Sequence, residues 1–356
     1  MCRLDRKLFL VFASVVTLFS VSCFGNSKTS LEGSVSVTGA SSQSVAQSVW
    51  ISEFRKIHPG VTVNYEPQGS GAGRRAFLSG AVDLAATDVP FADPELTGDF
   101  KGCTADGPLQ LPVYISPIAI AYNLPGVSDL KLDASVIAGI FSGAITTWDS
   151  PRISALNPGI ELPSKKITAV HRSDNSGTTE NFSDYIHTNA PSDWPHKPST
   201  KFPYTYGEAA KGTSGVAQVL KATVGSIGYL DLSLARGMSL ATLKVGSGFS
   251  KPSAESATLT VSDSEFPSKN PNSFSVKINR RTEKAGAWPL ILVSYVVACV
   301  GYKKGNKDAI FSYLKFILSE KAQGQAAQQA GSAPLPESLS KKLLELVNKI
   351  AEKNGA

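Results

Sequence analysis

Three short turns of this sequence combine hydroxyl side chains with the predicted start of a helix. Ser41 and Ser42 lie in "TGASSQS", Ser70 lies in "QGSGAGRR", and Ser176 and Thr178 lie in "DNSGTT". The first turn of a helix has backbone N–H groups without intrahelical acceptors, and the helix dipole adds positive potential there. Each turn therefore offers an anion both N–H and O–H donors.

The third turn also carries a cation. Arg172 presents a planar fork of donors that matches two oxygens of a tetrahedral oxyanion, and Asp174 is placed to hold that fork. Each feature has an ordinary structural explanation, because Ser, Thr and Asn are common helix N-caps and exposed ion pairs are common on surfaces. Three such turns together with an arginine favour an oxyanion site.

The glycine-rich turn does not match the known nucleotide-binding loops. It lacks the lysine of the phosphate-binding loop, and Arg74 stands where the dinucleotide pattern requires its last glycine. No G-x-S-x-G motif surrounds Ser70 or Ser176, and the four histidines show no metal-ligand spacing. We therefore expect no nucleotide cofactor, no acyl-transfer serine and no metal site.

Alternating strands and helices must position these turns. Strands are expected at 34–39, 61–66, 82–88, 109–123, 165–170 and 288–301. Helical spacing follows at 46–57, after Ser70, at 133–143 with Asp133 as the N-cap, and in two closing helices at 309–323 and around 339–350. The Ser- and Pro-rich stretch 250–273 is expected to be a surface excursion. This alternation predicts an open α/β fold with a parallel sheet and ligand-binding loops at the strand ends.

The N-terminus has the pattern of an export signal. Three basic residues precede the apolar run "LFLVFASVVTLF", which is too short for a membrane span and is followed by small residues and Cys23. We expect residues 1–22 to be a signal peptide, Cys23 to carry lipid and 23–32 to be a flexible tether. Ordinary signal cleavage nearby is the alternative, because Ser20 stands where lipoprotein signals usually have an apolar residue. The body would then be exported and lipid-anchored at the cell surface or the periplasmic face of the membrane.

Charge and cysteine content narrow the class further. Removal of residues 1–22 takes away three basic residues and one acidic residue, so the formal net charge falls from +6 to +4. The lysine pairs lie apart from one another, so no nucleic-acid partner is expected. Cys103 and Cys299 remain in an oxidising compartment, where a disulfide is the simplest expectation and two buried free thiols are the alternative.

Five segments, taken in order, resemble the substrate-binding protein of the phosphate-specific ABC transporter. They are "VSVTGASSQS", "VTVNYEPQGSGAGRRAFLSGAVDLAATDVP", "AITTWDSPRISALNPGIELPSKKITAVHRSDNSGTTENFSDYI", "GVAQVLKATVGSIGYLDLSLA" and "AWPLILVSYVV". The likeness covers nearly the whole mature chain. It implies a two-lobed, class II periplasmic-binding-protein-like fold in which hinge strands join the lobes, here 33–112 plus 290–356 and 113–289.

The resemblance also implies a ligand and its contacts. Members of that family close on inorganic phosphate and then dock on a membrane permease, and we expect this chain to do so as a monomer without a cofactor. At the first turn the family usually has threonine and phenylalanine, where an ungapped match puts Gln43 and Ser44. The phosphate contacts carried over by motif are Ser70, Asp88, Arg172, Ser176, Gly177 and Thr178, with Asp174 as a supporting residue. At the first turn we choose Ser42 as the contact on chemical grounds. Ser41 and Ser44 are its alternatives.

Asp88 is the residue expected to select the ligand. A carboxylate in a site lined with donors repels a fully deprotonated oxyanion but accepts a hydrogen bond from a protonated one. Phosphate carries a proton near neutral pH and sulfate does not. The expected function is an extracytoplasmic phosphate receptor and not an enzyme. The alternatives are a receptor for sulfate or molybdate and a phosphoester hydrolase, for which the sequence shows no histidine or carboxylate cluster.

Overall fold

The computed structural model describes residues 31–267 and 270–356. Residues 31–356 form a unit of their own. The expected signal peptide at 1–22, the expected lipid site Cys23 and most of the expected tether at 23–32 lie outside the described residues. Within the described part of the chain, none of the helices has the length and apolar character that crossing a bilayer would take.

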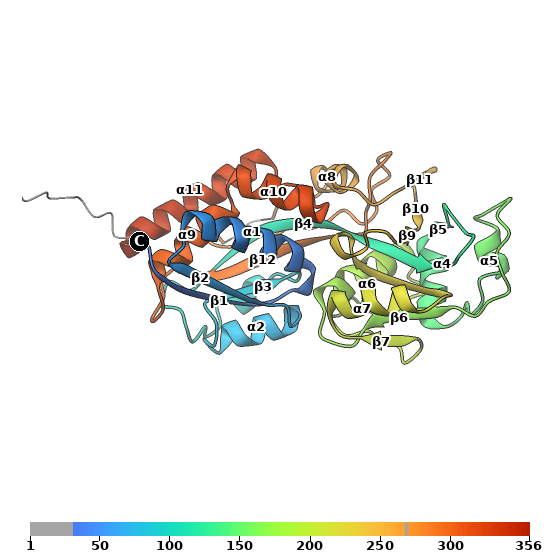
Figure 1. The fold of residues 1–356 in the computed structure, drawn as a ribbon, viewed down its shortest axis with the longest axis horizontal. Helices are drawn as coiled ribbons and strands as arrows, with labels where there is room; N and C mark the ends of the chain where they lie inside the picture. Colours follow the sequence, from blue (N-terminus) through green and yellow to red (C-terminus); the bar gives the residue numbers. More distant parts are fainter. Residues whose placement is uncertain (1–30, 268–269) are drawn as a thin grey trace, which may run out of the picture. The chain divides into compact units, whose positions relative to one another are not determined.

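One mixed sheet of nine strands extends through both lobes. Its order is β2, β1, β3, β12, β4, β8, β6, β7, and β9 pairs with β4 (Figure 1). The strands are β1 (Gly33–Gly39), β2 (Val61–Glu66), β3 (Leu84–Thr87), β4 (Pro108–Asn123), β6 (Thr168–Arg172), β7 (Glu208–Ala210), β8 (Ser226–Asp231), β9 (Ser239–Leu240) and β12 (Ile291–Cys299). A second sheet of three strands contains β5 (Lys131–Leu132), β10 (Thr242–Val245) and β11 (Gly248–Ser250).

Helices pack against both ends of the large sheet. Helices α1, α2 and α9 contact the strands β1 to β3, whereas α6 and α7 contact β6 and β8. The helices are η1 (Ser41–Gln43), α1 (Ser44–Ile57), α2 (Ser70–Leu78), α3 (Asp93–Leu96), α4 (Ala134–Ser142), α5 (Pro151–Ser154), α6 (Gly177–Asn189), α7 (Gly212–Ala222), η2 (Leu232–Leu234), α8 (Ala254–Ser262), α9 (Lys307–Ile317), α10 (Glu320–Ala330) and α11 (Glu337–Asn354).

The directions of the strands differ from the predicted parallel sheet at its centre. β1 pairs in parallel with β2 and β3, and β6 pairs in parallel with β7 and β8, as strand–helix alternation predicts. β12, however, is antiparallel to both β3 and β4, and β4 is antiparallel to β8. The prediction of a parallel sheet is wrong for these central strands, because an apolar run indicates burial but not direction.

β4 belongs to both lobes. Its residues Pro108–Pro117 pair with β12, whereas Ile118–Asn123 pair with β8. All of its residues except the last are buried, which agrees with its predominantly apolar sequence. The lobe limits expected at 112/113 and 289/290 stay predictions, and the change of pairing partner within β4 comes at 117/118.

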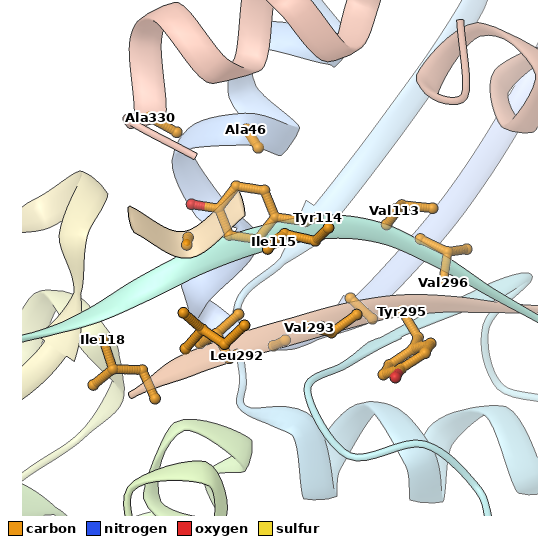
Figure 2. Packing of buried hydrophobic residues seen from close by; sticks show 14 of the residues in the cluster. Ala46, Val113, Tyr114, Ile115, Ile118, Leu292, Val293, Tyr295, Val296 and Ala330 are labelled. Atoms are coloured by element: carbon orange, nitrogen blue, oxygen red, sulfur yellow. The ribbon is translucent and has the colours of Figure 1, made fainter. Parts of the chain in front are cut away.

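The strand pair β4 and β12 contributes much of the buried core. Figure 2 shows Val113, Ile115 and Ile118 of β4 together with Leu292 and Val296 of β12. All five side chains are almost completely removed from solvent and belong to one hydrophobic cluster. Burying a side chain of this size stabilises the fold by about 1.5–3 kcal/mol, so this pair makes the connection between the lobes a packed element.

Two helix predictions need correction. The helix expected at 309–323 is two helices, because α9 ends at Ile317 and Ser319 caps α10, its Oγ accepting a hydrogen bond from Ala322 N at 3.3 Å. The stretch 250–273 is not only a surface excursion, because it contains α8. Ser253 caps this helix, and Ala257 and Val261 are buried against the core. The abundance of serine concealed a capped helix with a short apolar face.

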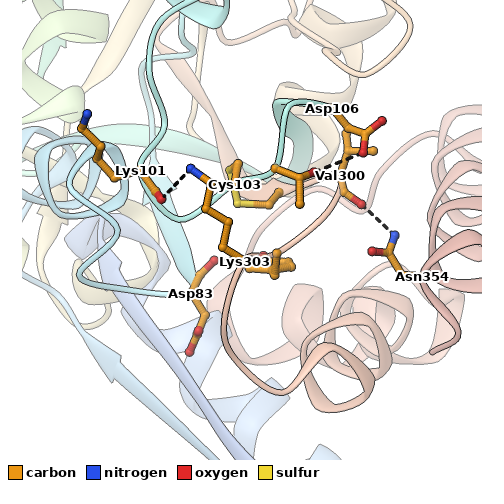
Figure 3. The surroundings of a disulfide bond; sticks show 10 residues. Asp83, Lys101, Cys103, Asp106, Val300, Lys303 and Asn354 are labelled. Atoms are coloured by element: carbon orange, nitrogen blue, oxygen red, sulfur yellow. Dashed lines mark hydrogen bonds between the residues drawn. A yellow bond between two sulfur atoms is a disulfide. The ribbon is translucent and has the colours of Figure 1, made fainter.

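The expected disulfide between Cys103 and Cys299 is confirmed. Its Cα atoms are 5.1 Å apart, and it ties the loop before β4 to the end of β12 (Figure 3). The same region is held by Asn354 of α11, whose Nδ2 donates to Val300 O at 2.8 Å, and by Lys303, whose Nζ donates to Lys101 O at 3.2 Å. A cross-link between residues 196 apart strongly restricts the unfolded chain. In small secreted domains, removal of a native disulfide lowers the free energy of unfolding by about 2–5 kcal/mol.

Candidate anion-binding site between the lobes

In the first lobe, the turns after β1, β2 and β3 converge. β1 is the neighbour of both β2 and β3 in parallel, so the carboxyl ends of all three strands lie at one edge of the sheet. Ser42 follows β1, and its Oγ donates to Asp88 Oδ1 at 2.7 Å. Ser70, which starts α2 after β2, accepts a hydrogen bond from Asp88 N at 3.1 Å through its Oγ. Parallel pairing thus gathers residues from three separate turns.

In the second lobe, the N-terminus of α6 faces this group. Thr178 Oγ1 donates to Asp88 Oδ2 over a long 3.4 Å, and Ser176 caps α6 by accepting from Thr179 N at 3.1 Å. A Cβ atom added to Gly177 would lie 2.5 Å from Asp88 Cβ and 2.6 Å from Ser70 Oγ. Only glycine permits this approach, so the helix N-terminus comes directly against the first-lobe turn.

Arg172, at the end of β6, forms a bidentate ion pair with Asp174. Its Nε donates to Oδ1 at 2.7 Å and its Nη2 donates to Oδ2 at 2.5 Å, and the two side chains are only 2% and 11% exposed. Burial opposes ionisation of Asp174, but the hydrogen bonds and charge of Arg172 and the N–H of Gly212 hold its pKa below the ordinary value. This is a buried, oriented guanidinium rather than a surface ion pair.

Asp88 is a buried carboxylate surrounded by donors. It is 4% exposed, and in addition to Ser42 and Thr178 it accepts a hydrogen bond from Ser294 Oγ at 2.5 Å. Burial raises its pKa above the ordinary value, whereas the bonds from Ser294 and Ser42 and the positive charge of Arg172 act in the opposite direction. The arrangement brings a hydrogen-bond acceptor, several hydroxyl donors, a cation and a helix N-terminus to one place.

Comparison with known proteins shows to which family this chain belongs. A family model described as "PBP superfamily domain" matches residues 25–321. The phosphate-binding protein PstS 3 of Mycobacterium leprae is 32% identical over 337 residues, which cover 93% of this chain and 89% of that protein. The chain belongs to the PstS family of phosphate-binding proteins. The resemblance predicted from the sequence is therefore confirmed.

Solved structures agree with the fold of the PstS family. A high-affinity periplasmic phosphate-binding protein bound with phosphate has a TM-score of 0.70 and 18% identity, covering 87% of this chain and 93% of that chain. A phosphate-binding protein from Stenotrophomonas maltophilia has a TM-score of 0.65 and 18% identity, covering 88% and 94%. The prediction of a two-lobed periplasmic-binding-protein-like α/β fold is confirmed.

Among the serines considered for the first turn of this PstS-family chain, Ser42 is the one whose hydroxyl contacts Asp88. Ser41 Oγ instead lies 3.0 Å from Thr213 Oγ1 and accepts a hydrogen bond from Thr213 N at 3.1 Å, so it joins the first lobe to α7. Ser44 opens α1 and lines a surface groove together with Ile51 and other residues of that helix. The geometry thus favours Ser42 over both alternatives.

Sequence reasoning missed several residues of the site. Thr213 lies in "KGTSGV" at the start of α7, which has the same combination of hydroxyl groups and a helix N-terminus as the three turns that were selected. Asn181, one turn into α6, donates through Nδ2 to Asp88 O at 3.0 Å. Ser294 is a single hydroxyl within the apolar strand β12, and Gln43 donates to it at 2.7 Å. For Ser294 the only signal was a polar residue in a buried run.

Proposed function

We propose that the mature protein is an extracytoplasmic receptor that binds inorganic phosphate between its two lobes and delivers it to an ABC permease for import. One observation carries the proposal. Asp88, a buried acceptor, lies among donors from both lobes, with Ser42 and Ser70 on one side and Thr178 and the N-terminus of α6 on the other. The names of the PstS relatives support the same ligand.

The donors account for binding a dehydrated anion. The guanidinium of Arg172 is held by Asp174, so it is oriented before the ligand arrives and loses little conformational freedom on binding. The helix dipoles at the N-termini of α2 and α6 favour an anion there. Because neither lobe holds all of these donors, phosphate stabilises the arrangement in which the lobes meet.

The acceptor accounts for selectivity. Hydrogen phosphate can donate its proton to Asp88, whereas sulfate would leave the carboxylate facing a bare oxyanion. An unpaired buried acceptor together with like-charge repulsion costs several kcal/mol, which corresponds to discrimination of about a thousandfold or more. A receptor for sulfate or molybdate would not need a carboxylate among its donors, so the position of Asp88 favours phosphate over these alternatives.

The remaining parts of the proposal concern partners and location. We propose binding without catalysis, a monomeric receptor, a permease partner and a lipid anchor at Cys23. Labelling cells with a clickable fatty acid tests the anchor. The label is expected on the wild-type protein and not on Cys23→Ser, and label retained in that variant would contradict the assignment.

Calorimetric titration tests the binding itself. The chain beginning at residue 31, which forms a unit of its own, is stripped of bound anion and titrated with phosphate and with sulfate. We expect tight phosphate binding and rejection of sulfate, with the rejection relieved in Asp88→Asn because the amide can donate to sulfate. Equal binding of both anions by the wild type, or no binding, would refute the proposal.

A further inference from the structure

Four buried side chains form a continuous hydrogen-bonded row behind Asp88. Tyr313 OH donates to Gln47 Oε1 at 2.6 Å, and Gln47 Nε2 donates to Gln43 Oε1 at 2.8 Å. Gln43 Nε2 donates to Ser294 Oγ at 2.7 Å, and Ser294 Oγ donates to Asp88 Oδ1 at 2.5 Å. The four residues come from α9, α1, η1 and β12, and each is fully buried.

The row has one direction, and a backbone group determines it. Gln43 Nε2 also donates to the carbonyl oxygen of Tyr295 at 3.1 Å. A carbonyl oxygen can only accept, so an amide turned the other way would place two oxygens against each other. Gln43 must therefore present an N–H to Ser294, and the hydroxyl hydrogen of Ser294 must point to Asp88.

The consequence is an asymmetric carboxylate. Asp88 Oδ1 accepts from both Ser42 and Ser294 at 2.7 and 2.5 Å, so a carboxyl proton on that oxygen would face two hydroxyl hydrogens. Among the described residues, Oδ2 has only the long 3.4 Å contact from Thr178 in the second lobe. Oδ2 is thus the oxygen that retains capacity to accept a further hydrogen bond.

Building on the proposed phosphate function, we infer that Gln43 is a positioning residue: it orients the Ser294 hydroxyl so that Asp88 stays an obligate acceptor and receives the ligand's proton through Oδ2. Hydrogen bonds to an ionised group are stronger than neutral ones. Loss of the oriented donor makes Asp88 take up a proton more readily, and a protonated Asp88 can donate to sulfate. The residue that departs from the family pattern at this turn therefore supports the selectivity of the site.

Other titratable groups near Asp88 must be separated from this effect. The guanidinium of Arg172 faces Asp88 from β6. Burial, with the charge of Asp88 among the further causes, raises the pKa of Tyr65 in β2 and of Tyr295 in β12, which keeps both phenols neutral. Glu180 of α6 lines the same cavity as Asp88, and burial raises its pKa as well. Titration of Glu180 contributes to the pH dependence of anion binding, so the comparison must be between variants that leave Glu180 unchanged.

The test measures sulfate and phosphate binding by calorimetry between pH 5 and pH 9 for the wild type, Gln43→Met and Ser294→Ala. In the wild type, sulfate is expected to bind only as the pH falls far enough to protonate Asp88. In both variants this onset should move up by about one pH unit.

Gln323→Met is the matched control. Gln323 is also a buried glutamine of the first lobe. Its Nε2 donates to Val113 O at 3.0 Å and Ile317 O at 2.7 Å, and its Oε1 accepts from Leu335 N at 3.3 Å, so the same substitution removes three bonds away from Asp88, as Gln43→Met removes three beside it. Sulfate onset in this variant should match the wild type. If Gln43→Met does not fold, Ser294→Ala carries the comparison alone.

The outcomes separate the inference from the function on which it rests. A wild-type protein that binds phosphate and rejects sulfate, with Gln43→Met and Ser294→Ala showing the same onset as Gln323→Met, would overturn the positioning role and leave the receptor intact. A wild-type protein that does not bind phosphate would overturn both. A shifted onset in the two variants with no shift in the control would support the inference.

Discussion

Asp88 and Asp231 are both buried carboxylates that follow or end a strand, yet their surroundings differ. Asp88 accepts two short hydrogen bonds at Oδ1 and one long contact from Thr178 at Oδ2, and the charge of Arg172 is nearby. At Asp231, Tyr114 OH at 3.0 Å and both the N–H and Oγ of Ser233 donate to Oδ1, and Oδ2 has no partner among the described residues. Burial raises the pKa of Asp231 to about 7, despite the opposing hydrogen bonds from Ser233.

The difference shows what opposes the rise in pKa that burial causes. Burial raises the pKa of both carboxyl groups, and at Asp88 the hydrogen bonds from Ser294 and Ser42 and the charge of Arg172 act against that rise. Asp88 is therefore suited to accept a proton from a ligand. Asp231 is the last residue of β8 and pairs with Ile118 of β4. Its second oxygen has no donor among the described residues, so it is suited to stay protonated in mildly acidic solution.

The largest expected effect on phosphate affinity comes from removing Arg172, the cation that lies near Asp88 and has no counterpart described at Asp231. Arg172→Met should weaken phosphate binding by about a hundredfold to several thousandfold, because it deletes the bidentate donor and leaves Asp174 buried without its partner, a loss of about 3–5 kcal/mol. Calorimetric titration measures it. Arg152→Met, which breaks a more exposed pair with Asp193 in the same lobe, should leave the affinity unchanged, and equal losses in both variants would contradict the assigned role.

A second prediction concerns the pH dependence of stability at Asp231. Because its folded pKa lies above the unfolded value, the folded state binds more protons between about pH 4 and pH 7, and stability falls as the pH rises through that window. From pH 5 to pH 8 this group should lower the free energy of unfolding by about 2–3 kcal/mol. Urea unfolding at both pH values should show that loss reduced in Asp231→Asn. An identical pH dependence in the variant would show that a group other than Asp231 causes the loss of stability.

The smallest predicted effect tests the close approach of the lobes at Asp88. In Gly177→Ala the new methyl group would overlap Asp88 Cβ and Ser70 Oγ, so the lobes could not meet as they do. Overpacking of this kind costs about 1–3 kcal/mol, and phosphate affinity should fall about tenfold to a hundredfold. Gly215→Ala is the control, because its nearest neighbours would lie 3.6 Å away. Equal affinity in the two variants would show that the contact between Gly177 and Asp88 is not needed for binding.

Much of the candidate site was predictable because its signals are local. Ser70, Ser176 and Thr178 stand at strand–helix turns, and Ser176 proved to be the N-cap of α6, whereas Asp88 was assigned through the resemblance to the phosphate-binding family. Capping, helix N-termini and turn chemistry depend on residues within a few positions of each other. The same locality explains the correct prediction of Asp133 as the cap of α4, where its Oδ1 accepts from Val136 N at 2.8 Å.

Contacts between distant segments were not predictable from such patterns. Gln43 and Ser294 are 251 residues apart, and Ser41 and Thr213 are 172 apart. Periodicity in one segment indicates which side chains are buried, but not which element buries them. For the same reason the sequence did not indicate that β4 and β12 run antiparallel through the centre of the sheet.

The sequence by itself therefore determined the alternating α/β elements, the hydroxyl-rich turns, the arginine and its aspartate, and the two cysteines that remain after the predicted signal peptide. Only the tertiary structure decided that Ser42 rather than Ser44 contacts Asp88, that Gly177 approaches it, and that Ser294 donates to it from inside an apolar strand. The physical reason is that local chemistry fixes what each turn can donate or accept, whereas strand order and packing fix which turns meet.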